Sequence, residues 1–203
     1  MWMLKELGVA FDHVPTPFTD GSTHTAEFLA INPNGRVPVL VDDGQTLFES
    51  LAINLYLARR FGGPLAAPTI TAEGLALQWS FWVTTEVEKP LLLAAANLML
   101  FAEPDRHAGE LAVMLSKLDR PFKVLDAQLA ERPYLLGPDF TVADLNVSAV
   151  LTLGVIAGVP LTAYPHLSSW LERCLERPAA ADWKPIKFQV PRPAGLGLLA
   201  MFV

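Results

Sequence analysis

The sequence predicts a mixed α/β domain over residues 1–62, a linker over 63–72 and an all-helical domain over 73–203. Turn clusters and short alternating apolar runs, which are typical of strands and hairpins, occur in the first of these parts. The stretch "GGPLAAPT" is rich in proline, glycine and alanine, as linkers often are. Beyond it, apolar residues recur in steps of three and four. The predicted fold class is therefore α/β followed by all-α.

The α/β part opens on a helix. Residues 2–7 carry apolar side chains at helical spacing, and Gly8 stands where a helix would end. Residues 9–14 then alternate between apolar and polar, which predicts a strand. No Ser, Thr, Asp or Asn precedes the helix to cap it, and no strand precedes it either. Residues 25–30 predict a second short helix.

A β-hairpin and a longer helix complete this part. The run "VPVLVDD" predicts a strand that turns at Asp43–Gly44 and pairs with "QTLFE", because Asp-Gly favours the tight turns of hairpins. Ser50 is then expected to cap a helix, since a serine hydroxyl can accept from free backbone N–H groups. Arg59 and Arg60 lie favourably at the negative end of that helix.

Two apolar stripes mark the helical domain. One runs over residues 111–129, and Pro121 is expected to kink it. Pro90 is expected to kink the preceding helix in the same way. The second stripe covers residues 167–175 and includes the single cysteine, Cys174, which is therefore predicted to be an inert core thiol.

The segment "FTVAD" at residues 140–144 is the sharpest local signal in the helical part. Thr141 can cap a helix, and Asp144 can reach back to the backbone N–H of Thr141. Phe140 and Leu145 flank this capping box as a hydrophobic staple. The pattern predicts a role in folding and carries no chemistry.

Composition excludes several classes of protein. The net charge is −6 and no run of Lys or Arg occurs, which argues against a nucleic-acid partner. One cysteine cannot form an internal disulfide, and the N-terminus has no signal-peptide pattern. Residues 145–171 lack Asp, Glu, Lys and Arg, but Asn146, Gly154 and Pro160 interrupt the stretch and favour a buried helix over a membrane span. We therefore expect a soluble, cytoplasmic protein with no membrane partner.

Few residues outside the first part point to chemistry. The four histidines have no metal-ligand spacing, and each is interpreted as a solvated or capping residue rather than a base. They are His13, His24, His107 and His166. A set of apolar residues could line a site for an apolar co-substrate, although aromatic residues at helical spacing more often form plain core. The set comprises Trp79, Phe81, Trp82, Met99 and Phe101.

The functional signal lies in "GRVPVL" and "FES". The Val37–Pro38 bond, between a glycine turn and a strand, is a candidate cis bond that would turn the backbone of Val37 outward to pair with an extended peptide. Glu49 and Ser50 lie at the start of a predicted helix, where free N–H groups suit a carboxylate. Ser50 would add a hydroxyl donor, and Glu49 would suit a neighbouring amino group. Together they predict a site for an amino-acid zwitterion beside a peptide backbone.

The order of these motifs resembles the glutathione transferase family. The resemblance rests on "EFLAINPNGRVPVLVDDGQTLFESLAINLYLARRFGG", the linker, "FTVADL" and "YPHLSSWLERCLERPA", and it covers roughly residues 1–180. It implies a thioredoxin-like N-terminal domain and an all-helical C-terminal domain. It also implies glutathione as co-substrate, no metal, and a homodimer.

The resemblance assigns roles to individual residues. It implies that Val37, before a cis Pro38, pairs with the cysteinyl backbone of glutathione, and that Glu49 and Ser50 hold the γ-glutamyl end. Arg36 stands near the position where several classes place a residue for the glycine carboxylate. Leucine follows Ser50 where some classes have arginine, so one charge partner is missing.

The implied reaction is attack of the glutathione thiolate on an apolar electrophile, which the family uses in detoxification. Two alternatives stay open. One is a glutathione-dependent isomerase, reductase or dehalogenase on the same scaffold. The other is a non-enzymatic relative that binds ligands or partner proteins.

The beginning of the chain bears on this choice. In the family a first strand and a loop, which holds the Ser, Tyr or Cys that acts on the sulfur, precede the first helix. "MWMLKELGVAFDHV" resembles the later part of that helix and the next strand, so we expect this strand and the catalytic residue upstream of Met1 and assign no catalytic residue within the chain. Transferase activity is expected only when that N-terminus is present. Three interpretations follow: a start assigned too late, a truncated relative without transferase chemistry, or another segment that fills the gap.

The apolar C-terminal tail is one such segment. It carries no charge after Arg192 and is expected to be buried. It would pack over the helical domain or close the cleft between domains. The alternative is that residues 198–203 occupy the place of the missing strand.

Overall fold

Helices dominate the computed structural model of the chain, which describes residues 1–183. The α-helices and strands, in chain order, are α1 (Trp2–Leu7), α2 (Ala26–Ile31), β1 (Val39–Asp42), β2 (Gln45–Phe48), α3 (Ser50–Phe61), α4 (Ile70–Trp82), α5 (Lys89–Leu100), α6 (Ala108–Leu129), α7 (Val142–Ala157) and α8 (Pro165–Leu175). Short 3₁₀ turns connect them at Ser22–His24, Gly63–Leu65, Glu103–Asp105 and Pro178–Trp183, and a π-helical segment, η3 (Val83–Glu88), joins α4 to α5. Residues 198–203, for which two placements were predicted, lie outside the described part.

The hairpin forms as predicted. β1 and β2 pair antiparallel from Val39 opposite Phe48 to Asp42 opposite Gln45. Asp43 and Gly44 occupy the turn with φ of 52° and 74°, the left-handed values that an Asp-Gly hairpin turn requires.

The strand predicted over residues 9–14 is wrong. α1 ends at Gly8 in the left-handed conformation, as predicted, and the chain then runs without regular structure to the turn at Ser22–His24. Within residues 1–183, β1 and β2 pair only with each other, so residues 9–14 have no ladder partner. Val14 is 77% exposed. An alternating pattern becomes a strand only where another strand satisfies its backbone groups.

The N-cap of α3 lies one residue earlier than predicted. Glu49, not Ser50, is the N-cap residue, and Ser50 is the first residue of the helix. Glu49 has φ of 69°, an unusual value for a non-glycine residue. The helix ends at Gly62, after Arg59 and Arg60 in its last turn.

The two prolines expected to kink helices lie in different settings. Pro90 stands at the start of α5, directly after η3, so the change of helix type precedes it. Pro121 lies inside α6, which continues from Ala108 to Leu129. The helix is not interrupted at Pro121, which is itself buried in the core stripe of α6, and the kink expected there stays a prediction.

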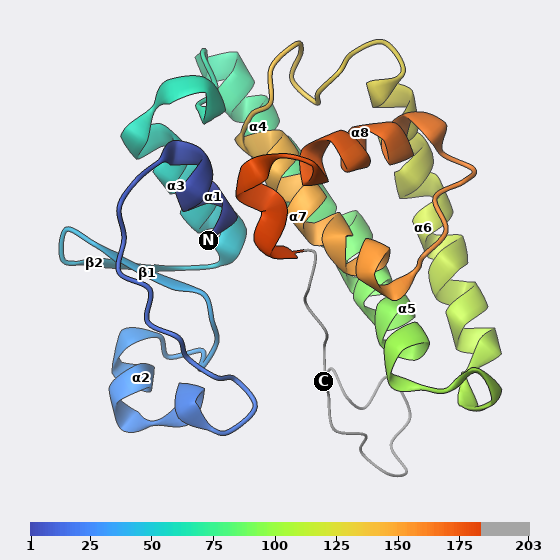
Figure 1. The fold of residues 1–203 in the computed structure, drawn as a ribbon, viewed down its shortest axis with the longest axis horizontal. Coiled ribbons are helices and arrows are strands. Elements are labelled where there is room, and N and C mark those ends of the chain that lie inside the picture. The colour runs from blue at the N-terminus through green and yellow to red at the C-terminus, as the bar shows by residue number, and fades with distance from the viewer. Residues whose placement is uncertain (184–203) are drawn as a thin grey trace.

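α7 is the central element of the helical part. It packs against α3, α4, α5 and α8, and Figure 1 shows it between α1 and α3 on one side and α5 and α6 on the other. Most of its first ten residues are buried. It is apolar enough to raise the question of a membrane, but none of the helices within residues 1–183 combines the length and the hydrophobicity that a span requires.

The predicted capping box starts α7. The carboxylate of Asp144 accepts from the backbone N–H of Thr141 at 3.0 Å, and it also accepts from the N–H of Leu135 at 2.8 Å and from Nε1 of Trp170 at 3.0 Å. Burial raises the pKa of Asp144 despite these hydrogen bonds. One carboxylate thus joins α7, α8 and the loop before α7.

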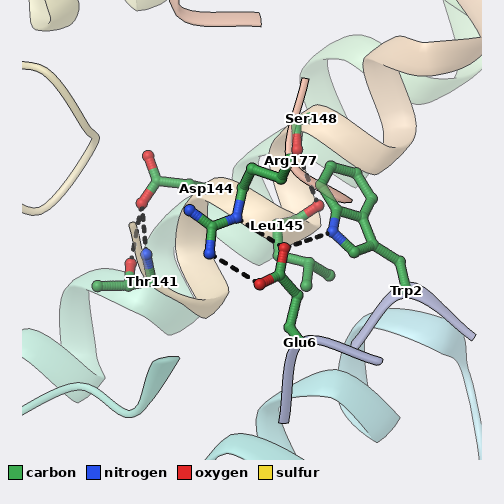
Figure 2. Close-up of polar contacts among 7 residues, drawn as sticks. All are labelled: Trp2, Glu6, Thr141, Asp144, Leu145, Ser148 and Arg177. Carbon is green, nitrogen blue, oxygen red and sulfur yellow. Dashed lines mark hydrogen bonds and ion pairs between the residues drawn. The ribbon is translucent and has the colours of Figure 1, made fainter. Parts of the chain in front are cut away.

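A second carboxylate joins the two ends of the described chain (Figure 2). Arg177 donates from Nε and Nη2 to the two oxygens of Glu6 at 2.6 and 2.7 Å. Nε1 of Trp2 donates to the same carboxylate at 2.9 Å, and the Arg177 guanidinium lies 4.0 Å from the ring centre of Phe140. We call Trp2, Glu6, Phe140 and Arg177 the α1 clamp, because it fixes α1 to the helical part.

Candidate functional site

The residues predicted to form the site meet at the open end of the hairpin. The Val37–Pro38 bond is cis, as predicted. Val39 and Phe48 form the last pair of the ladder, so residues 37–38, which precede Val39, and residues 49–50, which follow Phe48, leave the hairpin at the same end. All four residues are exposed. The fold therefore brings the two halves of the sequence signal to one place on the surface.

The backbone of Val37 is available for pairing. Val37 is 39% exposed, and in the part of the chain that the structure describes no hydrogen bond engages its N–H or C=O. An extended peptide could use both groups, as peptides do when they add to the edge of a sheet.

A buried asparagine shapes the loop that leads to Val37. Asn32 is 1% exposed, and its side chain donates to the carbonyl of Arg36 at 2.6 Å. Its Oδ1 accepts from the backbone N–H of Asn34 at 3.1 Å, and its carbonyl accepts from the N–H of Gly35 at 3.0 Å. These bonds fix residues 32–36 as one turn.

Gly35 is required in this turn for two reasons. Its φ is +61°, which favours glycine, and a Cβ there would lie 3.2 Å from the carbonyl oxygen of Thr23 and 3.1 Å from Nε2 of His24. The turn before Val37 therefore packs closely against residues 23–24.

The N-terminus of α3 offers donors for an anion. The first backbone bond of the helix runs from the N–H of Ile53 to the carbonyl of Glu49 at 2.9 Å. Helix geometry leaves the N–H groups before Ile53 without intrahelical acceptors. They add to the partial positive charge of a helix start, and the Ser50 hydroxyl stands beside them. The arrangement suits a carboxylate.

Two further contacts hold α3 against the hairpin. The Tyr56 hydroxyl donates to Oδ2 of Asp42 at 2.9 Å, and Arg60 forms an ion pair with the same carboxylate at 2.7 Å. The hydrogen bond to Asp42 raises the pKa of Tyr56. Asp42 thus ties the middle of α3 to the end of β1.

Glu88, the last residue of η3, adds negative charge near the site. Partial burial raises its pKa, and the charge of Glu49 raises it further. Glu88 carries no local sequence signal, because only the fold brings the helical part close to Glu49. Asn32 was not predicted either, although its place in the turn cluster "INPNGR" was a usable signal.

Of the other candidates, Arg36 adjoins the site, whereas the histidines and the cysteine are not part of it. Arg36 is exposed and contributes its carbonyl to the turn. The four histidines are not gathered: His107 stacks edge-on against Phe101 at 5.0 Å, and the backbone N–H of His166 donates to Asp126. Cys174 is fully buried, and burial raises the pKa of its thiol. It is the core thiol that was predicted.

The apolar set proposed for a co-substrate is not gathered into one site. Trp79 is buried and packs edge-to-face with Trp82 at 5.2 Å, as core residues do. Phe81 is 66% exposed. A groove of about 410 Å³ lies between α3 and α4, but it is lined by the later part of α3, from Leu55 on, rather than by its start at Ser50.

Comparison with known proteins gives a consistent picture. Residues 1–59 match the family model "Glutathione S-transferase, N-terminal domain", and residues 89–178 match "Glutathione S-transferase, C-terminal domain". Glutathione S-transferase 3 of Zea mays is 33% identical over 196 residues, which cover 87% of this chain and 83% of that protein. Glutathione S-transferase GstB of Escherichia coli (strain K12) is 30% identical over 181 residues, covering 87% and 86%.

Solved structures show the same similarity. The theta class glutathione S-transferase from Xanthomonas axonopodis pv. citri, solved with glutathione bound, has a TM-score of 0.82 at 27% identity and covers 92% of this chain and 90% of that one. Glutathione S-transferase-I bound with lactoylglutathione has a TM-score of 0.79 at 27% identity, covering 90% of each chain. The architecture of a thioredoxin-like N-terminal part followed by a helical C-terminal part is thereby established.

Proposed function

Since this chain belongs to the glutathione S-transferase family, we propose that it binds glutathione at the open end of the β1–β2 hairpin and conjugates it to an apolar electrophile. The observation that carries the proposal is the meeting of the free Val37 backbone with the N-terminus of α3. The glutathione in the Xanthomonas structure supports it.

Each end of glutathione has a matching group. The cysteinyl backbone pairs with the N–H and C=O of Val37, next to Pro38. The γ-glutamyl carboxylate accepts from the hydroxyl of Ser50 and from the free N–H groups of α3. The γ-glutamyl ammonium lies near Glu49, where the same negative charge raises the pKa of Glu88. Arg36, exposed on the neighbouring turn, attracts the glycine carboxylate.

These residues contribute to the reaction by holding glutathione in place. The sulfur of the thiolate forms a bond to an electrophilic carbon, and the leaving group departs with its electron pair or the acceptor takes up a proton. Holding the tripeptide along Val37 and α3 fixes where the sulfur lies, so that the thiolate meets its acceptor in one orientation.

A binding and a turnover measurement together test this function. We expect glutathione to bind to the chain. We expect a generic aromatic chloride to be converted to its glutathione conjugate when the protein carries the N-terminal segment on which transferase activity is expected to depend. Glutathione binding without conjugation would favour the alternatives, a glutathione-dependent enzyme of another reaction type or a non-enzymatic ligand-binding relative. No binding of glutathione would refute the proposal.

We also propose a homodimer. Ile70, Leu77 and Phe81 are 82%, 43% and 66% exposed, and their spacing of seven and four places them on one face of α4. Exposed apolar residues that share a helix face favour a protein partner. Sedimentation should give twice the mass of one chain, and Phe81→Lys should shift it toward the monomer. A monomeric wild-type chain would refute this proposal.

A cytoplasmic location, an apolar acceptor and a role in detoxification complete the proposal. Membership of the glutathione S-transferase family supports it. A panel of apolar electrophiles, ranked by kcat/KM, tests the acceptor class. Preference for charged acceptors over apolar ones would contradict it.

A further inference from the structure

A buried polar network connects the first turn of α3 to the helical part. Asn146 of α7 is fully buried. Its Nδ2 donates to the carbonyl of Leu51 at 3.3 Å and to the hydroxyl of Ser80 at 2.9 Å, and its Oδ1 accepts from Nδ2 of Asn54 at 2.8 Å. The Ser80 hydroxyl in turn donates to the carbonyl of Ala76 at 2.7 Å.

The network admits one orientation of the Asn146 amide. An exchange of its oxygen and nitrogen would set an oxygen against the carbonyl of Leu51 and a donor against the donor of Asn54. In the observed orientation both hydrogens of Nδ2 and the oxygen Oδ1 are engaged. A satisfied polar network in a buried place fixes the elements that it joins.

The two contacts of Asn146 on α3 lie at the start of the helix, next to the candidate site. Leu51 directly follows Ser50, and Asn54 lies one helical turn further on, on the same side as Ser50. Asp42 fixes α3 from the hairpin side through Tyr56 and Arg60. From the helical side, Asn146 provides a polar attachment near the start of α3, and Glu73 of α4 provides another near its end through Arg59.

We infer that Asn146 is a positioning residue for glutathione: it holds the first turn of α3 so that the Ser50 hydroxyl and the free N–H groups meet the γ-glutamyl carboxylate. The inference rests on the proposed function. Asn146 does not touch the ligand in this scheme. It acts through Leu51 and Asn54. Replacing Asn146 should therefore change the affinity for glutathione more than it changes the packing of the helical core.

The chain offers a matched control. Ser80→Ala removes two hydrogen bonds from the same buried network at its α4 end but leaves both contacts of Asn146 on α3. Asn146→Leu, which keeps the branching at Cγ but is larger, removes both contacts on α3. Asn54→Ala removes one of them at a partly buried position and remains informative if Asn146→Leu fails to fold.

Two measurements on the full chain test the inference. Titration calorimetry with glutathione should give a Kd about tenfold higher for Asn146→Leu, about threefold higher for Asn54→Ala, and unchanged for Ser80→Ala, in line with the loss of hydrogen bonds that act on the site. Hydrogen–deuterium exchange without ligand should increase over residues 50–55 in Asn146→Leu and Asn54→Ala, and stay at the wild-type level there in Ser80→Ala.

The outcomes separate the inference from the function on which it rests. Failure of the wild-type chain to bind glutathione refutes the proposed function and, with it, the role of Asn146 at the site. Normal wild-type binding with equal Kd values for Asn54→Ala and Ser80→Ala overturns the inference and leaves the function standing. Unchanged exchange over residues 50–55 in Asn54→Ala overturns the positioning claim whatever the affinities.

Discussion

The α1 clamp should contribute measurably to the stability of the chain. Arg177→Met keeps an apolar stem over Phe140 but removes both hydrogen bonds to Glu6, and Glu6→Gln keeps an acceptor for Trp2. Exposed ion pairs contribute about 0–1 kcal/mol, and breaking a buried pair costs about 3–5 kcal/mol. The Glu6 side chain is 8% exposed and that of Arg177 is 32% exposed. The pair is intermediate, so we expect Arg177→Met to cost about 2 kcal/mol.

A double-mutant cycle in urea isolates the pair. The coupling free energy between Glu6→Gln and Arg177→Met should be about 1–2 kcal/mol. Arg173→Met is the control, because Arg173 is exposed, donates only to the carbonyl of Pro133 and lies over Tyr134. A coupling energy below about 0.5 kcal/mol, or an equal loss for Arg173→Met, would refute the assignment of an interdomain clamp.

The clamp also predicts a dependence on pH. Burial on its own raises the pKa of Glu6, but the hydrogen bonds from Arg177 and Trp2 and the charge of Arg177 outweigh it, so the pKa lies below the ordinary value of 4.5. The unfolded chain therefore binds this proton more tightly than the folded one. The contribution of Glu6 is complete above about pH 4.5 and is lost as the pH falls through the folded pKa. Glu6→Gln should lose less stability than wild type over that range.

Three further predictions concern the core and the turn before the site. Asp144→Ala should destabilise the chain by at least about 3 kcal/mol in urea unfolding, because the donors of Leu135 and Trp170 lose their acceptor in a buried place; a loss under about 1 kcal/mol would contradict this. Gly35→Ala should cost about 1–2 kcal/mol and weaken glutathione binding, since φ is +61° and the added Cβ meets backbone; wild-type affinity would show that the turn tolerates it. Cys174 should react with a thiol reagent only after unfolding, because it is buried and its pKa is raised; rapid modification of the native chain would contradict the core assignment.

Local sequence patterns were sufficient to predict those features of the structure that depend on consecutive residues. The Asp43–Gly44 turn, the capping box at Thr141 and the left-handed Gly8 each depend on a few consecutive residues, and each was predicted. The strand over residues 9–14 failed because an alternating pattern does not say whether a partner strand is present.

Contacts between distant parts of the chain could not be predicted in this way. Glu6 and Arg177 are 171 positions apart, and Leu51 and Asn146 are 95 apart. Nothing in the residues around Asn146 marks it as different from other polar residues of an apolar helix. The residues proposed to touch glutathione were found from sequence, whereas the side chains that hold them in place emerge only from the fold.

Calorimetric titration of glutathione into the wild-type chain and into Ser50→Ala tests the central claim most directly. Ser50 is the first residue of α3 and is exposed, so its replacement should leave the fold intact while it removes one donor to a carboxylate. We predict binding by the wild-type chain and a loss of about 1–2 kcal/mol, roughly five- to thirty-fold in Kd, for Ser50→Ala. Ser116→Ala, an exposed serine on α6, should bind as the wild type does. Equal affinity of all three chains for glutathione, or no binding by the wild-type chain, would contradict the account.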